Sequence, residues 1–221
     1  MLFPDVGGRW LIQQRVTRVL DRWKGETVCI AASGPSLVPA DVGQALDAGC
    51  KVIVINETWR ASPAAHVLYA ADYAWWASRA PPAGEFKGER WTTPKNWTTK
   101  HAALLKSLHQ VETKGGCDIV RAPPICTGSN SSFQALSLAV LWGAKRVVFT
   151  GLDMKCGPGG EDHWHGVHEE LTSPRRALGT FAKAFERASP QLVARGVEVI
   201  NASRDTALTC FPRASMREAL T

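Results

Sequence analysis

The sequence has no Cys-x-x-Cys pair, no signal-peptide pattern at residues 1–21, and no apolar run of the roughly 18 residues that a membrane-spanning helix needs. Six cysteines are scattered along the chain, and Cys29 falls inside an expected core strand. This usage fits reduced thiols better than a disulfide framework or a cysteine zinc site. We therefore expect a cytoplasmic protein with no membrane span.

The sequence also lacks a block of Lys and Arg, an internal repeat, a low-complexity segment and a linker that would divide the chain. Its formal net charge of +6 favours an anionic partner only mildly, because nucleotide phosphates, nucleic acid or a solvated surface would each account for it. A hydrophobic content of 45% allows a sizeable core, and 221 residues suffice for one large domain or a domain with a small addition.

Strands and helices are expected to alternate along the chain. The expected strands cover residues 27–32, 51–55, 67–71, 118–121, 146–150 and 197–200. The expected helices cover residues 9–23, 39–48, 73–79, 101–108, 130–142 and 174–188. The alternation predicts an α/β fold, with a single Rossmann-like three-layer domain at residues 26–221 that follows a helical extension at residues 1–25. The sheet is expected to be mostly parallel, with helices on both faces.

The first polar loop, Ser33-Gly34-Pro35-Ser36, directly follows a buried apolar run. Gly34 permits close approach of the backbone to an anion, and Pro35 fixes the turn. A strand that ends in a small-residue loop and passes into a helix can bind phosphate through backbone N–H groups, although an ordinary turn has the same pattern. Ligands of parallel sheets lie outside the carboxyl ends of the strands. The side chains expected to join this loop at that edge are Asn56, Asp72 and Asp153.

A second polar loop precedes the clearest helix of the chain. Its residues are Thr127, Gly128, Ser129, Asn130, Ser131 and Ser132. One hydroxyl or amide would suffice to cap the helix, so the excess favours a ligand site in which the positive end of the helix dipole holds a phosphate or a developing anion.

A third loop begins at Asp153, just after a strand, and contains three histidines within six residues, His163, His165 and His168. Asp and His together can hold a divalent ion, although the spacing is not that of a helical His-Glu-x-x-His site. Proton transfer is an equally natural role, because neutral histidine titrates near pH 7. The remaining interpretation is a polar surface loop in which the histidines occur by chance and have no function.

Tryptophan is common, with nine residues in the chain. Four of them are considered for an acceptor-binding or base-stacking surface: Trp75, Trp76, Trp91 and Trp97. Packing in the core is the better expectation for each.

These motifs together resemble the bacterial sialyltransferase family, whose members carry Gly-Asn-Gly-Pro-Ser-Leu. They are also similar to the related domain of motility-associated glycosyltransferases and of archaeal pterin pyrophosphokinases. Small phage-encoded proteins share the arrangement, including the His-Trp-His-Gly loop and a C-terminal segment like residues 206–212. The resemblance covers most of residues 26–213. Ala32-Ser33 replaces the family's Gly-Asn pair, which removes a side-chain amide.

The resemblance implies a nucleotide site and a histidine base. The implied nucleotide-binding residues are Ser33, Gly34, Pro35, Ser36, Asn56, Asp72, Thr127, Gly128, Ser129 and Asn130. The implied catalytic residues are Asp153 and one of His163, His165 and His168. In the pyrophosphokinase relatives, aspartates at strand ends bind magnesium, which gives Asp72 or Asp153 a metal role.

The expected function is therefore a nucleotide-sugar-dependent glycosyltransferase whose donor is a nucleotide-sugar, with a CMP-linked sugar as one candidate and magnesium as a candidate cofactor. The acceptor is a saccharide, a small molecule or a modified DNA base. One alternative is a magnesium-dependent phosphoryl or pyrophosphoryl transferase. Another is a non-catalytic phage accessory protein that binds nucleotide or nucleic acid, and a phage-encoded protein would act in the host cytoplasm.

Overall fold

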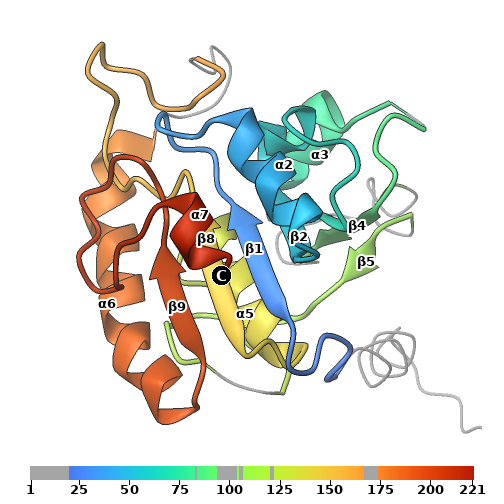
Figure 1. Ribbon diagram of the computed structural model, residues 1–221. Coiled ribbons are helices and arrows are strands. Elements are labelled where there is room, and N and C mark those ends of the chain that lie inside the picture. The colour runs from blue at the N-terminus through green and yellow to red at the C-terminus, as the bar shows by residue number, and fades with distance from the viewer. Residues whose placement is uncertain (1–19, 83, 94–103, 105–106, 120–121, 167–173) are drawn as a thin grey trace, which may run out of the picture.

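A seven-stranded sheet organises the computed structural model of the chain (Figure 1). The structure describes residues 20–82, 84–93, 104, 107–119, 122–166 and 174–221. The strands are β1 (Thr27–Ala31), β2 (Lys51–Ile55), β3 (Val67–Tyr69), β4 (Glu89–Thr92), β5 (His109–Gln110), β8 (Arg146–Thr150) and β9 (Glu198–Asn201). Their order is β5-β4-β3-β2-β1-β8-β9, and each neighbouring pair is parallel. The predicted α/β fold with a parallel sheet is confirmed.

Helices cover both faces of this sheet. They are α2 (Pro39–Asp47), the 3₁₀ helix η1 (Asn56–Arg60), α3 (Tyr73–Arg79), α5 (Ser131–Leu141), η3 (Pro174–Ala177), α6 (Leu178–Ala194) and α7 (Met216–Ala219). Successive strand side chains point to opposite faces, so Val28 and Ile30 pack with α5 and α6, whereas Cys29 and Ala31 pack with α2, α3 and α7. The result is three layers, with the front helices α2 and α7 and the rear helix α5 on either side of β1 (Figure 1).

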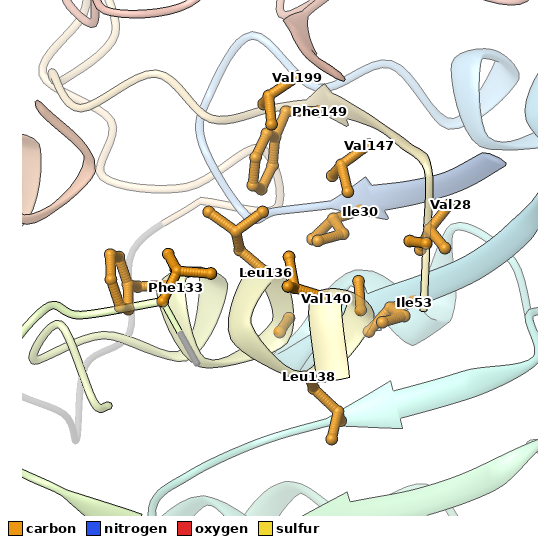
Figure 2. Packing of buried hydrophobic residues seen from close by; sticks show 14 of the residues in the cluster. Val28, Ile30, Ile53, Phe133, Leu136, Leu138, Val140, Val147, Phe149 and Val199 are labelled. Carbon is orange, nitrogen blue, oxygen red and sulfur yellow. The ribbon is translucent and has the colours of Figure 1, made fainter. Parts of the chain in front are cut away.

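Helix α5 is the most deeply packed helix of the fold. Each residue from Ser132 to Leu141 is buried, and Figure 2 shows Leu136 and Val140 directed at the side chains of β1 and β8. Asn130 begins the helix, because its Oδ1 accepts a hydrogen bond from the Phe133 N–H at 2.8 Å. Gly143, at φ 87°, ends it.

Several short elements were not predicted from the sequence. They are β4, β5, α7 and a separate two-stranded parallel sheet of β6 (Thr113–Lys114) and β7 (Ile125–Cys126). Strands of two to four residues are too short to carry a periodic pattern, and pairing with neighbours defines them. The strand predicted at 118–121 is not found at Asp118 and Ile119, and residues 120–121 lie outside the described residues.

Two of the predicted helices end at residues other than those in the structure. Residues 20–24 form turns rather than the end of the helix predicted at 9–23, whose first part lies outside the described residues, as does most of the helix predicted at 101–108. Helix α6 continues beyond Ala188 through Pro190 to Ala194. Burial of Leu192 in the core explains this continuation, because packing outweighs the hydrogen bond that proline removes.

The strand order reverses between β1 and β8. The chain runs outward from β1 through β2, β3, β4 and β5, and then returns through α5 to the other side of β1. The connections that follow β1 and β8 therefore pass to opposite faces, α2 in front and α6 behind, and leave a crevice at the carboxyl ends of these strands. Within the described part of the chain, no helix is long and apolar enough to cross a membrane.

Candidate functional site

A cavity of about 550 Å³ occupies this crevice. The loops that follow β1, β2, β3 and β8 line it, together with the start of α5 and the start of α6. The lining residues that the sequence predicted are Ser33, Gly34, Asn56, Asp72, Ser129, Asn130, Ser131, Ser132, Asp153 and His163. Four predicted nucleotide-binding residues do not line it: Pro35, Ser36, Thr127 and Gly128.

Ser33 holds the first polar loop in place. Its Oγ donates to the Ile55 carbonyl at 3.0 Å and lies 3.1 Å from the Thr58 hydroxyl, so this side chain joins the ends of β1 and β2. The Ser33 carbonyl accepts the Trp164 N–H at 3.2 Å and lies 3.3 Å from His163 Nδ1. The Ser33 hydroxyl is thus engaged within the protein, and the Ser33 backbone anchors the histidine loop.

Gly34 brings the first loop against the loop after β8. Its N–H donates to the Gly151 carbonyl at 2.8 Å. A Cβ atom built on Gly34 would lie 2.5 Å from both the Gly151 carbonyl oxygen and Asp153 Cγ. Glycine is therefore required here by the close approach of two loops.

Ser36 and Asp153 complete the same junction. The Ser36 N–H and Oγ donate to the two carboxylate oxygens of Asp153, at 2.6 and 2.7 Å. Asp153 is only 3% exposed, and burial raises its pKa although the bonds from Ser36 act in the opposite direction. Asp153 therefore positions the site, and both of its oxygens are already engaged.

The C-terminal segment braces the loop after β8 from behind. Ser203 Oγ accepts the Leu152 N–H at 2.7 Å, and Thr206 Oγ1 donates to the Leu152 carbonyl at 2.7 Å. The Ala207 N–H donates to the Asp153 carbonyl, also at 2.7 Å. The motif at residues 206–212 thus fixes Asp153 through backbone contacts.

The amino end of α5 contributes backbone donors to the cavity wall. Asn130 satisfies the Phe133 N–H, whereas the N–H groups of Ser131 and Ser132 find no acceptor within the described part of the chain. Both residues line the cavity. Free N–H groups and the positive end of the helix dipole suit an anionic group.

Gly128 shapes the approach to α5 without lining the cavity. Its φ is +50°, and a Cβ atom there would lie 2.1 Å from Cγ of Phe133. Ser129 follows at φ 61°. Two successive left-handed residues turn the chain sharply into the helix, so Gly128 has a packing role.

The histidine loop places one ring on the cavity wall. The Ser33 carbonyl can only accept a hydrogen bond, so His163 Nδ1 carries the proton in that contact. In the neutral ring Nε2 then bears the lone pair. Burial lowers the pKa of His163, outweighing Ser33 and Asp162, which raise it. Below that pKa the ring is protonated, and at neutral pH it can serve as a base.

The other two histidines of the loop differ from His163. The His165 ring stacks on that of His163, with centroids 5.2 Å apart and an interplanar angle of 9°, but His165 does not line the cavity. His168 lies outside the described residues. The sequence alone left the three equivalent, and the contact with Ser33 distinguishes His163.

Asn56 and Asp72 present polar groups at the ends of β2 and β3. Asn56 adopts φ 49°, and its Oδ1 is buried with no hydrogen-bond partner in the described part of the chain. Asp72 stands at the N-cap position of α3 without capping it, and no described residue pairs with its carboxylate. It is exposed at the cavity mouth, yet the surrounding protein desolvates it and raises its pKa. The unpartnered oxygen of Asn56 and the desolvated carboxylate of Asp72 each cost free energy in the folded protein. A ligand that bonds to these groups could offset that cost.

Replacing Asp72 with asparagine is expected to raise the melting temperature at pH 7 and to leave it unchanged near pH 3. A raised carboxyl pKa means that the stability of the protonated form is present below the ordinary pKa of about 3.9 and is lost as pH rises through the folded-state value. Asparagine removes that loss. Calorimetric melts at both pH values test this, with Glu186→Gln on the surface of α6 as control; a lower melting temperature for Asp72→Asn at pH 7 would contradict it.

Several other lining residues were not singled out from the sequence. Lys155 lies on the cavity wall and pairs with Asp205, and Phe181 and Met154 add apolar surface. A lysine two residues after a strand-end aspartate was the available signal for Lys155. Of the tryptophans, Trp75 lines the cavity while being 1% exposed; Trp76 and Trp91 are also buried, and Trp97 lies outside the described residues.

A smaller chamber of about 230 Å³ adjoins the cavity. The two share Asp72, Ser129, Asn130 and Ser131. Hydroxyl and amide groups line most of the chamber, from Tyr73, Thr93, Thr113, Thr127, Ser129, Asn130, Ser131 and Gln134. Asp72 is its only charged residue among those described, so the lining suits an uncharged group rich in hydroxyls.

No family model matches the chain, and no curated protein or solved structure shows significant similarity to it. Within the described residues, no three His, Cys, Asp or Glu side chains gather as a metal site. The function must therefore be inferred from the chemistry of the cavity.

Proposed function

We propose that the protein transfers a sugar from a nucleotide-sugar donor to an acceptor hydroxyl. The observation that carries this proposal is His163, which lines the cavity in a tautomer fixed by the Ser33 carbonyl. The same cavity contains the uncapped N–H groups of α5, so a base and an anion-stabilising group share one site. The motif resemblance to sialyltransferases agrees with this proposal.

The donor phosphate would lie against the N–H groups of Ser131 and Ser132, with Lys155 adding positive charge from the loop after β8. Asn56 would donate and accept hydrogen bonds at the end of β2, where its buried oxygen lacks a partner among the described residues. The adjoining chamber would receive sugar hydroxyls, with Asp72 at the junction.

In the transfer step, His163 Nε2 would accept the proton of the acceptor hydroxyl as the acceptor oxygen attacks the anomeric carbon. The bond between that carbon and the phosphate oxygen breaks, and the nucleotide leaves with the electron pair. The α5 amino end would stabilise the negative charge that develops on the leaving phosphate. The imidazolium then returns its proton to solvent.

A magnesium-dependent phosphoryl or pyrophosphoryl transfer is the second candidate, because three carboxylates line the cavity, those of Asp72, Asp153 and Asp162. Magnesium commonly binds through one or two carboxylates together with substrate phosphates. Both Asp153 oxygens accept hydrogen bonds from Ser36, and Asp162 is paired with Arg175 at 2.7 Å, which makes Asp72 the better ligand. Metal-dependent transfer of phosphate that Asp72→Asn abolishes would favour this candidate, and full activity in that variant would exclude Asp72 from it.

Replacing Asn56 with glycine is expected to weaken nucleotide binding by roughly 2- to 10-fold, the value of one net hydrogen bond of about 0.5–1.5 kcal/mol. Glycine accepts the φ of 49° without strain, so the fold should be retained and the melting temperature should stay close to that of the wild type. Isothermal titration calorimetry with CMP, UMP and their sugar conjugates, with and without magnesium, measures the change.

The same titrations test the proposal itself. A wild-type protein that binds none of these nucleotides or nucleotide-sugars would overturn it. Binding without turnover in the presence of saccharide, small-molecule and DNA acceptors would favour the non-catalytic nucleotide-binding alternative.

A further inference from the structure

A second depression, of about 750 Å³, lies at the opposite edge of the sheet. Lys51 begins β2, Glu89 begins β4 and His109 begins β5, so these lining residues lie at the amino ends of the strands, whereas the candidate site lies at the carboxyl ends. The lining residues on which the binding argument depends are Arg22, Lys51, His66, Lys87, Glu89 and Arg90. Nothing in the proposed transfer uses this surface.

Positive charge dominates the depression. Glu89 is the one carboxylate in its described lining, and Arg22 holds both of its oxygens, at 2.7 and 3.2 Å. The Trp91 indole N–H also donates to Glu89, at 2.8 Å. Lys51, Lys87 and Arg90 have no acidic partner within the described part of the chain. Three cations therefore line this depression, and the one carboxylate among its described lining residues is already engaged.

His66 adds a fixed donor to this surface. Its Nδ1 accepts the Val52 N–H at 3.1 Å, so the ring proton sits on Nε2. Burial lowers the pKa of His66, and the charges of Lys51 and Arg22 lower it further. The imidazole is therefore neutral at pH 7, with its N–H as a donor. Donors without a competing acceptor are what an anion requires.

We propose that this depression is a second binding site, and that its ligand is an anion carrying several phosphate groups, either a nucleic-acid backbone or a small polyphosphate. Three cations and an imidazole N–H match several phosphate oxygens rather than a single carboxylate. Its place at the amino edge separates it from the nucleotide cavity. Occupancy of one site therefore does not require the other.

The test compares two double variants of the full chain with equal loss of charge. Lys51→Gln with Lys87→Gln removes two cations of the depression, and Lys183→Gln with Arg187→Gln removes two exposed cations from α6. The probes are a fluorescein-labelled single-stranded oligonucleotide, followed by anisotropy at several salt concentrations, and tripolyphosphate, followed by calorimetry. CMP titration monitors the carboxyl-edge cavity in each variant.

We expect the depression variant to bind at least one probe about tenfold or more weakly at low salt, with CMP binding unchanged. For the oligonucleotide, the negative slope of log K against log salt should become shallower by about 1.4. The reason is that two phosphate contacts, each contributing roughly 0.7 to the slope, are lost. Weakened oligonucleotide binding identifies the nucleic-acid backbone as the source, and weakened tripolyphosphate binding alone identifies a small polyphosphate. Equal losses in the two double variants, or no wild-type binding to either probe, would overturn the proposal.

Discussion

Replacing His163 with glutamine is expected to slow the proposed sugar transfer by about 10²- to 10⁴-fold, the usual contribution of a positioned general base. Glutamine can still donate a hydrogen bond to the Ser33 carbonyl, but its amide does not accept a proton near neutral pH as a histidine ring nitrogen does. Nucleotide affinity should therefore change little while kcat falls. Initial rates with the donor that calorimetry identifies, set beside the affinity for that donor, separate the two effects.

The pH dependence of kcat tests the same assignment of His163. Burial lowers the pKa of His163, so its basic form persists below the ordinary value of about 6.5. Wild-type kcat should be flat above that pH and should fall only in more acidic solution, where the ring becomes protonated. His165→Gln is the matched control, because its ring stacks on His163 outside the cavity. If kcat fell as far in His165→Gln as in His163→Gln, the assignment of His163 as the base would be wrong.

Replacing Gly34 with alanine is expected to lower the free energy of unfolding by about 1–3 kcal/mol and to remove most nucleotide binding. The added methyl group would overlap the Gly151 carbonyl and the Asp153 carboxylate, which are parts of a buried junction. Relief requires the two loops to separate, and separation would break the bonds between Ser36 and Asp153. Urea unfolding and CMP calorimetry measure the two effects on one preparation.

Gly43→Ala provides the control for the Gly34 substitution. Gly43 lies inside α2, and apart from its chain neighbours and the backbone of α2 itself, no heavy atom lies within 4 Å of the position that its Cβ would occupy. Alanine there should leave nucleotide binding intact and should stabilise the protein by up to about 1 kcal/mol, through helix propensity. If Gly34→Ala and Gly43→Ala had the same stability and the same affinity, the close approach of the two loops would not be required.

These two predictions rest on one structural property of the site. The loops after β1, β2 and β8 hold one another through Ser33, Gly34 and Asp153, and the C-terminal segment braces Asp153 through its backbone. The cavity therefore depends on contacts between loops. A substitution in one loop changes the positions of the other loops of the site.

Hydrophobic runs were sufficient to predict the central strands. The residues of β2, β8 and α3 match the predicted ranges, and β1 and β9 differ by about one residue, because fully buried parallel strands read as continuous apolar stretches. The edge strands β4 and β5 escaped prediction. Each is short and is defined by pairing with its neighbour, which leaves no periodic signal in the sequence.

The polar loops were also visible in the sequence, because Gly, Pro, Ser, Asn and Asp at strand ends mark turns, and the rule for parallel sheets places those ends at one edge. Their assembly into one cavity follows from the strand order, which the sequence pattern did not specify. That order reverses between β1 and β8 and thereby opens the crevice.

The sequence by itself determined the α/β class, the central strands and the polar character of one sheet edge, since these depend on local periodicity and composition. The tertiary structure decided which polar side chains serve the fold and which face the cavity. Ser36 is paired with an aspartate 117 residues away, and His163 is distinguished from His165 by a carbonyl 130 residues away. Such contacts leave no local pattern, because folding alone brings the two partners within hydrogen-bond distance.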